Sequence, residues 1–152
     1  MVTFADPAVE AICLANWDNG DGYFMKSEAE AVTNVRIVFQ NADITSFNEF
    51  GLFTGVTSLV DAAFRYCSSL EYLTIPKNVA SMGWRALDSC SGLKVLVILK
   101  EGSILAANSN ALSGMAVSEA IYVPDDLVES YKTASYWSNF ADKFKPLSEY
   151  TE

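Results

Sequence analysis

The feature that most constrains this chain is an internal repeat with a step of 23 residues. Apolar residues and a Cys-Ser-Ser-Leu motif in residues 59–75 recur in residues 82–98, where the motif reads Cys-Ser-Gly-Leu. Eight paired positions keep this spacing, which is more than chance gives. Because a fixed step of this length is the signature of stacked repeat architectures, we expect a solenoid and not a layered globular fold.

Each repeat predicts one coil of the solenoid. Leu73-x-Ile75 and Leu96-x-Ile98 have the period of two that is typical of a short strand with inward side chains. One coil cannot bury these residues alone, but stacked coils bury them against each other, with their strands side by side in a parallel sheet. Weaker copies precede and follow these two. We therefore predict an α/β solenoid of about two good and two partial coils.

Both ends of the chain have helical patterns that would cap the open core. At the N-terminus, Asp6-Pro7 predicts a helix start, and Ser27-x-x-Glu30 predicts a second one. At the C-terminus, apolar residues spaced 4, 3, 3, 3 and 4 apart predict one helical face, with Ser135 as a point where the helix could break. These residues are Leu127, Tyr131, Ala134, Trp137, Phe140 and Phe144. We expect a single domain over 1–152, with an N-terminal cap at 1–50, repeats at 51–124 and a C-terminal cap helix at 125–152.

The segment between the two N-terminal helices resembles a shortened EF-hand calcium loop. Asp18, Asn19, Asp21 and Glu28 supply the oxygen ligands that calcium prefers, and Gly22 supplies the sharp turn. Counted from Gly22, the first ligand position falls on Trp17, so the loop is one residue short. Calcium binding is one interpretation. A helix–turn–helix that has lost its metal and a simple surface turn are the others.

Composition excludes several classes of function. The chain has no histidine, which removes the commonest general base and most transition-metal ligand sets. Net charge is −9, and the excess acids lie in residues 1–50 and 125–152, so nucleic acid is a poor partner. Three cysteines without a CxxC motif give no disulfide framework, and we expect Cys67 and Cys90 to stack as small buried thiols. We therefore expect no enzyme and no cofactor apart from the calcium considered above.

The repeat Phe64-x2-Cys67-Ser68-Ser69-Leu70-x2-Leu73-x-Ile75-Pro76 resembles the BspA-type leucine-rich repeats of bacterial surface proteins. Residues 4–29 and 121–148 resemble the segments that flank such repeats. The resemblance implies a leucine-rich-repeat fold, an extracellular or cell-surface location, and a binding or adhesion role without catalytic residues. Residues 1–8 lack the features of a secretory signal, and no apolar run is long enough to span a bilayer.

The strands also predict a binding face, because side chains that do not point into the core must point out. Across the coils, two outward rows are expected: Tyr72, Val95 and Ala120 in one, Thr74, Val97 and Tyr122 in the other. An exposed stripe of this kind often marks an interface. The candidate partners are a protein or glycan at the host or cell surface, or a second copy in a homodimer through the strand face. A structural spacer whose strand face has no ligand is the alternative.

Overall fold

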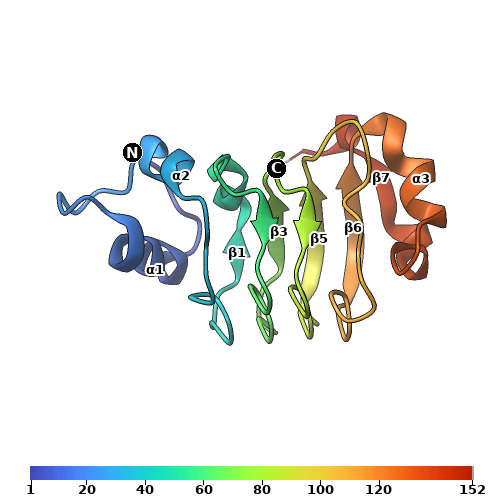
Figure 1. Ribbon diagram of the computed structural model, residues 1–152, viewed down its shortest axis with the longest axis horizontal. Helices are drawn as coiled ribbons and strands as arrows, with labels where there is room; N and C mark the ends of the chain where they lie inside the picture. The colour runs from blue at the N-terminus through green and yellow to red at the C-terminus, as the bar shows by residue number, and fades with distance from the viewer. Residues whose placement is uncertain (152) are drawn as a thin grey trace.

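The computed structural model describes residues 1–151 and shows a row of stacked coils with helices at both ends (Figure 1). The coils share an open five-stranded sheet in which neighbouring strands run parallel, in the order β1-β3-β5-β6-β7. The predicted parallel arrangement is therefore confirmed. The strands are β1 (Ser46–Phe47), β3 (Tyr72–Ile75), β5 (Leu93–Ile98), β6 (Val117–Val123) and β7 (Phe144–Pro146).

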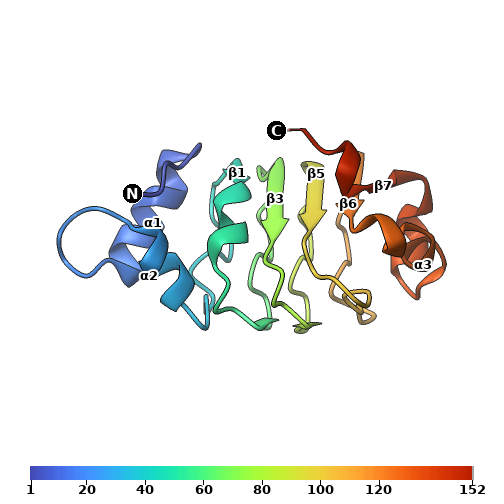
Figure 2. The ribbon, with the colours of Figure 1, turned by 90° about the horizontal axis from the view of Figure 1, so that it is seen from above.

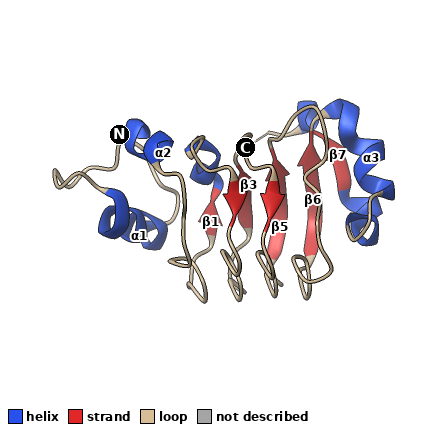
Figure 3. Cartoon of the chain, viewed as in Figure 1, coloured by secondary structure: helices blue, strands red, loops and turns tan. Residues whose placement is uncertain are grey.

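A second, two-stranded sheet forms part of the opposite wall. It pairs β2 (Ser58–Leu59) with β4 (Ser81–Met82) in parallel, again with a step of 23 residues. Most of each coil between these strands is loop (Figure 3). The inward side chains of β3 and β5 pair as predicted, Leu73 with Leu96 and Ile75 with Ile98, and all four are fully buried. The repeat in the sequence is thus the repeat of the core.

A ladder of backbone hydrogen bonds joins the coils at the turn edge. The amides of Asn41, Tyr66 and Ser89 each donate to a carbonyl of the next coil, at 2.8, 2.9 and 2.7 Å. These three residues and Gly114 have positive φ, between 59° and 69°. The left-handed conformation costs a non-glycine residue about 1–2 kcal/mol. This local strain lowers the net stability that the ladder of hydrogen bonds contributes. The coils extend on both sides of the predicted repeat segment, since β1 precedes residue 51 and β7 follows residue 124.

The cysteines pack as predicted. Cys67 and Cys90 are free, fully buried, and donate from Sγ to the carbonyl oxygens of Phe39 and Phe64, at 3.0 and 3.1 Å. Each bond reaches the preceding coil. Burial raises the pKa of Cys67 to about 12 and raises that of Cys90 as well, so both thiols stay protonated. Their position favours a packing role.

The N-terminal cap begins where the sequence predicts. Helix α1 (Pro7–Trp17) starts after Asp6, whose Oδ1 accepts from the amide of Ala8 at 2.8 Å. The other oxygen of Asp6 accepts from the amide of Thr45 at 2.6 Å, which ties the cap to the first coil. Helix α2 (Lys26–Ala31) begins before the predicted start at Ser27, because Glu28 accepts from the amide of Met25 and so caps an earlier turn.

The C-terminal cap is more broken than the predicted helix. It contains the 3-10 turn η2 (Asp125–Leu127), helix α3 (Val128–Thr133) and the 3-10 turn η3 (Trp137–Lys143). Helix α3 ends because Ala134 takes an extended conformation (ψ of 147°), and Tyr136, with φ of +68°, precedes η3. Phe144 is in strand β7 and not in a helix, and the chain continues into the 3-10 turn η4 (Leu147–Glu149).

Two buried aromatic side chains, Tyr131 and Trp137, hold the C-terminal cap through hydrogen bonds to the backbone of Leu105. The amide of Leu105 donates to the Tyr131 hydroxyl at 2.8 Å, and Trp137 Nε1 donates to the Leu105 carbonyl at 2.6 Å. The ring of Tyr131 stacks on that of Phe144 with centroids 5.1 Å apart. Burial raises the pKa of Tyr131 to about 12, so this hydroxyl keeps its proton. These contacts close the end of the solenoid core.

Candidate functional site

The outer face of the five-stranded sheet carries the two predicted rows. Tyr72 pairs with Val95, which pairs with Ala120, and Thr74 pairs with Val97, which pairs with Tyr122. The register therefore places each row across neighbouring coils as expected. These side chains lie on the opposite side of the sheet from the core residues Leu73, Leu96 and Ile121.

The expectation that this face is an open apolar stripe is wrong, because four of its six side chains, Ala120 among them, are buried. Thr74, Val95 and Val97 expose only 6%, 8% and 1% of their surface. The 3-10 turn η1 (Asn48–Leu52) lies over the sheet, so close that a Cβ on Gly51 would be 3.0 Å from Thr74 Cγ2. The Thr74 hydroxyl donates to Asn48 Oδ1 at 2.9 Å, which fixes this cover.

The C-terminal segment covers the same face from the other end. After β7 it turns back toward the middle strands (Figures 1 and 2), so that Tyr150 and Thr151 line one groove with Tyr72 and Val95. The Tyr150 ring rests against the Tyr122 ring with centroids 4.9 Å apart. A small hollow of about 240 Å³ remains beside Thr74 and Val97, between η1 and Tyr150.

Below this cover the face is open, and we call the opening the outer groove. It has a volume of about 510 Å³, which is within the range of small ligand sites. Tyr72 and Tyr122 are half-buried in it, and Val95, the strand partner of Tyr72, is buried beside them. The groove is lined by Ala5, Asn48, Glu49, Tyr72, Val95, Glu119, Tyr122, Tyr150 and Thr151.

Sequence reasoning missed six of these nine residues, and three of the six carry the chemistry discussed below: Glu49, Glu119 and Tyr150. Glu49 and Tyr150 come from segments outside the repeat, and no local pattern indicates that they reach the strand face. Glu119 points outward because β6 has one extra residue there: Leu93 pairs with Val117, but Val95 pairs with Ala120. The two-residue departure from the repeat frame near residue 121 was the only available signal of an irregularity.

Carboxylates flank the groove. Glu49 Oε1 accepts from the amide of Ala5 at 2.8 Å, whereas Glu49 Oε2 is buried and accepts no hydrogen bond from any described residue. Glu119 is exposed. Beside the groove, Lys94 pairs with Glu71 at 3.1 Å and lies 6.0 Å from the centre of the Tyr72 ring. Its hydrogen bond to Glu71 raises the pKa of Lys94, so it stays charged.

The four calcium candidates lie in one loop, but their oxygens bond mainly to the loop itself. Both carboxylate oxygens of Glu28 accept from backbone amides, those of Asn19 and Met25, each at 2.7 Å. Asp18, Asn19 and Asp21 accept from amides further along the loop, at 2.8–3.1 Å. Within residues 1–151, no three acidic or cysteine side chains are gathered as a metal would require. Calcium binding at this loop stays a prediction.

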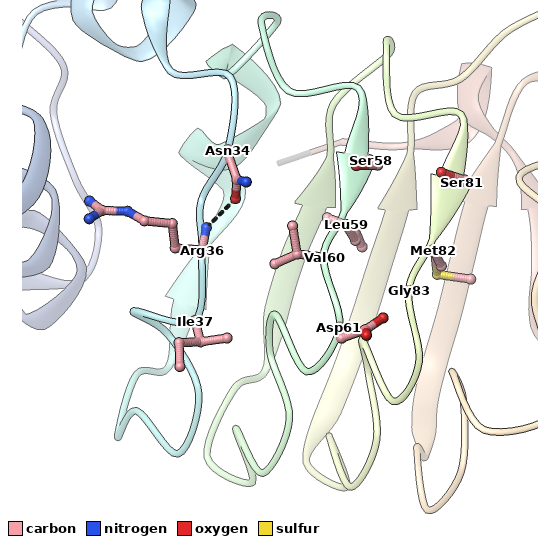
Figure 4. Close-up of a pocket in the computed structure, with 10 residues that line it drawn as sticks. All are labelled: Asn34, Arg36, Ile37, Ser58, Leu59, Val60, Asp61, Ser81, Met82 and Gly83. Carbon is pink, nitrogen blue, oxygen red and sulfur yellow. Dashed lines mark hydrogen bonds between the residues drawn. The ribbon is translucent and has the colours of Figure 1, made fainter.

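A wider hollow of about 580 Å³ lies on the opposite wall, over β2 and β4 (Figure 4). Two of its polar side chains bond to backbone amides, and a third turns away. Asn34 Oδ1 accepts from the amide of Arg36 at 2.7 Å, and Asp61 Oδ1 accepts from that of Trp84, also at 2.7 Å. The Arg36 guanidinium points away from β2 and lies 5.8 Å from the centre of the Trp17 ring. No aromatic side chain lines this hollow, whereas three tyrosines line the outer groove.

Comparison with known proteins gives one match. The family model described as BspA type Leucine rich repeat region matches residues 36–142, in six copies. No curated protein matches the chain. Among the described residues, no helix has the length and apolar character needed to cross a bilayer. Since the matched region covers most of the chain and contains strands β1 to β6, this protein belongs to the family with BspA-type leucine-rich repeat regions.

Proposed function

We propose that this chain is a non-catalytic binding module that holds its ligand in the outer groove. The observation that carries the proposal is the half-exposed Tyr72 beside Val95 on the floor of a groove of about 510 Å³. Tyrosine supplies a large apolar surface and a polar end at little conformational cost, and it is enriched at recognition sites. Repeat solenoids commonly bind partners on the extended surface that their strands form.

Several features support a role without catalysis. The carboxylates with a clearly shifted pKa lie outside the groove, and their pKa values are lowered and not raised. Burial would raise the pKa of Asp6, but hydrogen bonds from Thr45 and Ala8 lower it. Hydrogen bonds from Ser148 lower the pKa of Asp125. Such groups are poor general acids at neutral pH, because they hold no proton there.

We further propose that the module works at a cell surface and that its partner is a protein or a glycan there. The family supports this location, because such repeats resemble those of bacterial surface proteins. The alternative is a structural spacer. The cover of Thr74 and Val97 by the chain itself favours a spacer, whereas the opening at Tyr72 favours binding.

A homodimer through the strand face stays a prediction. The walls formed by η1 and Tyr150 leave little flat apolar surface for a second copy, since Val97 is 1% exposed. Light scattering after size-exclusion chromatography would test it. A dimer that a Val95→Lys variant dissociates would favour pairing through this face.

The binding proposal is tested by presenting the biotinylated protein to glycan and peptide arrays. We expect specific ligands, and at least about tenfold weaker binding by a Tyr72→Ala variant, as for an aromatic residue at the centre of an interface. Tyr23→Ala is the matched control, because Tyr23 is 60% exposed and lies in the loop before α2, away from the groove. Equal binding by both variants would place the ligand elsewhere, and an absence of ligands for the native chain would favour the spacer.

A further inference from the structure

The chemistry of the outer groove defines the kind of ligand that would fit it. Of the nine residues that line it, two are acids, Glu49 and Glu119, and none is basic. Lys94, which lies near the Tyr72 ring, is already paired with Glu71. Lys145 is the sheet neighbour of Tyr122 but does not line the groove. The whole chain carries a net charge of −9, so a cationic ligand would also be attracted over a distance.

Glu49 has an unused acceptor. Its Oε1 accepts from the Ala5 amide at 2.8 Å, but its buried Oε2 has no hydrogen-bond partner among residues 1–151. A buried carboxylate oxygen without a donor is costly, and a charged donor is the partner that compensates it best. A small rotation of the Glu49 side chain would present this oxygen to a ligand, because Glu49 is half-buried and lines the groove.

Aromatic rings complete the site. Tyr72, Tyr122 and Tyr150 line the same groove. Aromatic faces attract ammonium and guanidinium groups, and they pack well against the aliphatic stems of lysine and arginine. The molecule already shows this preference, since Lys94 Nζ lies 6.0 Å from the centre of the Tyr72 ring.

From these contacts we infer that the outer groove binds an extended peptide segment with two lysine or arginine residues, one at Glu49 and one at Glu119. The inference rests on the proposed binding function and names its ligand. Glu49 follows β1 and Glu119 lies in β6, three strand steps away across β3 and β5. Three steps are about 14 Å, and an extended chain rises about 3.3 Å per residue. The two basic residues are therefore four positions apart, on one side of the segment.

The test is an NMR titration of the ¹⁵N-labelled chain with an acetylated, amidated peptide, Ala-Lys-Ala-Ala-Ala-Lys-Ala. We expect shifts at the amides of Tyr72, Val95 and Glu119. A matched peptide with glutamine in place of lysine should bind at least about tenfold more weakly, and raising NaCl from about 50 to about 300 mM should weaken the lysine peptide, because salt screens charges. A panel of neutral oligosaccharides and apolar peptides is titrated in parallel.

Two variants make the test specific. A Glu49→Gln/Glu119→Gln variant should lose most affinity, whereas Glu101→Gln/Asp126→Asn removes the same charge from exposed acids outside the groove and should bind like the native chain. The side-chain amide oxygen that the Glu49→Gln change leaves in place can still accept from the Ala5 amide. If the first variant does not give a folded spectrum, Glu119→Gln alone serves, because Glu119 is exposed.

Each outcome decides between the two claims. Groove shifts that need lysine and both carboxylates support the inference. If a neutral oligosaccharide or apolar peptide shifts the groove and the lysine peptide does not, the cationic inference is wrong and the groove remains a binding site. Equal binding of the lysine and glutamine peptides also overturns it. If no ligand of any class shifts the groove, both the inference and the proposed function fail.

Discussion

Gly92 tests the spacing between coils, on which the whole solenoid depends. It replaces the serine found 23 residues earlier, Ser69, in the repeated Cys-Ser-x-Leu motif. A Cβ at Gly92 would lie 2.5 Å from the carbonyl oxygen of Ser68, in the neighbouring coil. The obstacle is backbone, so it cannot rotate away. To reach an ordinary contact of about 3.4 Å, the two coils must separate locally by about 0.9 Å.

The cost of Gly92→Ala follows from this displacement. Just beyond the contact, the amides of Lys94 and Val95 both donate to the Glu71 carbonyl, at 2.8 and 3.1 Å, and a shift of this size would break one of these bonds. Overpacking costs about 1–3 kcal/mol and a lost hydrogen bond about 1 kcal/mol. Replacing glycine also stiffens the unfolded chain, which returns about 0.5–1 kcal/mol. We expect a net loss of about 2–3 kcal/mol.

Urea unfolding followed by circular dichroism measures this loss. Ser69→Ala is the matched control, because Ser69 has the equivalent position in the previous coil and is exposed. The control should change the free energy of unfolding by less than about 0.5 kcal/mol. If Gly92→Ala is as stable as the control, the coils are not in the close contact described here.

Three further predictions concern charge, thiols and calcium. Burial would raise the pKa of Asp88, but hydrogen bonds from Arg85, Ser89 and Arg65 lower it. The stability that ionised Asp88 contributes is therefore present above its unfolded pKa of about 3.9 and is lost as the pH falls through the lower folded value. In urea titrations Asp88→Asn should cost about 2 kcal/mol at pH 7 and less at about pH 2; a cost that does not change with pH would contradict this. All three cysteines are buried, and burial raises the pKa of Cys13 and of Cys67 to about 12. A thiol reagent at pH 8 should therefore label the native chain far more slowly than the unfolded chain. Fast labelling of the native chain would show that the core opens. Glu28 already accepts hydrogen bonds from two backbone amides. Millimolar calcium should therefore change the melting temperature by less than about 1 °C relative to EGTA. A rise of several degrees that the Asp21→Asn variant abolishes would instead establish a calcium site.

The repeat made most of the fold predictable, because identical positions in successive coils must face the same surroundings. Leu73 and Leu96, Cys67 and Cys90, and the outward pairs of β3 with β5 all take the places that the 23-residue step predicts. The start of α1 at Asp6 and Pro7 was predictable for a different reason, because a helix start is decided by a few neighbouring residues.

What could not be predicted depends on segments that cross the repeat. The cover over Thr74 comes from Gly51, and the wall of the outer groove comes from Glu49 and Tyr150. No periodicity connects these residues to the strand face. The apolar outer residues Val95 and Val97 were expected to be exposed, but they are buried, and the chain itself supplies the cover. Exposure is decided by tertiary contacts, which a repeat pattern alone does not contain.

The central claim is that the outer groove is the recognition surface of this molecule, and it can be tested without knowing the ligand. The measurement is a chemical-shift map of the ¹⁵N-labelled chain against a library of small fragments, since fragments gather at true binding sites. We expect the chemical-shift changes caused by unrelated fragments to converge on Tyr72, Val95 and Glu119. Convergence on the hollow over β2 and β4, around Val60 and Gly83, or no convergence at all, would contradict it.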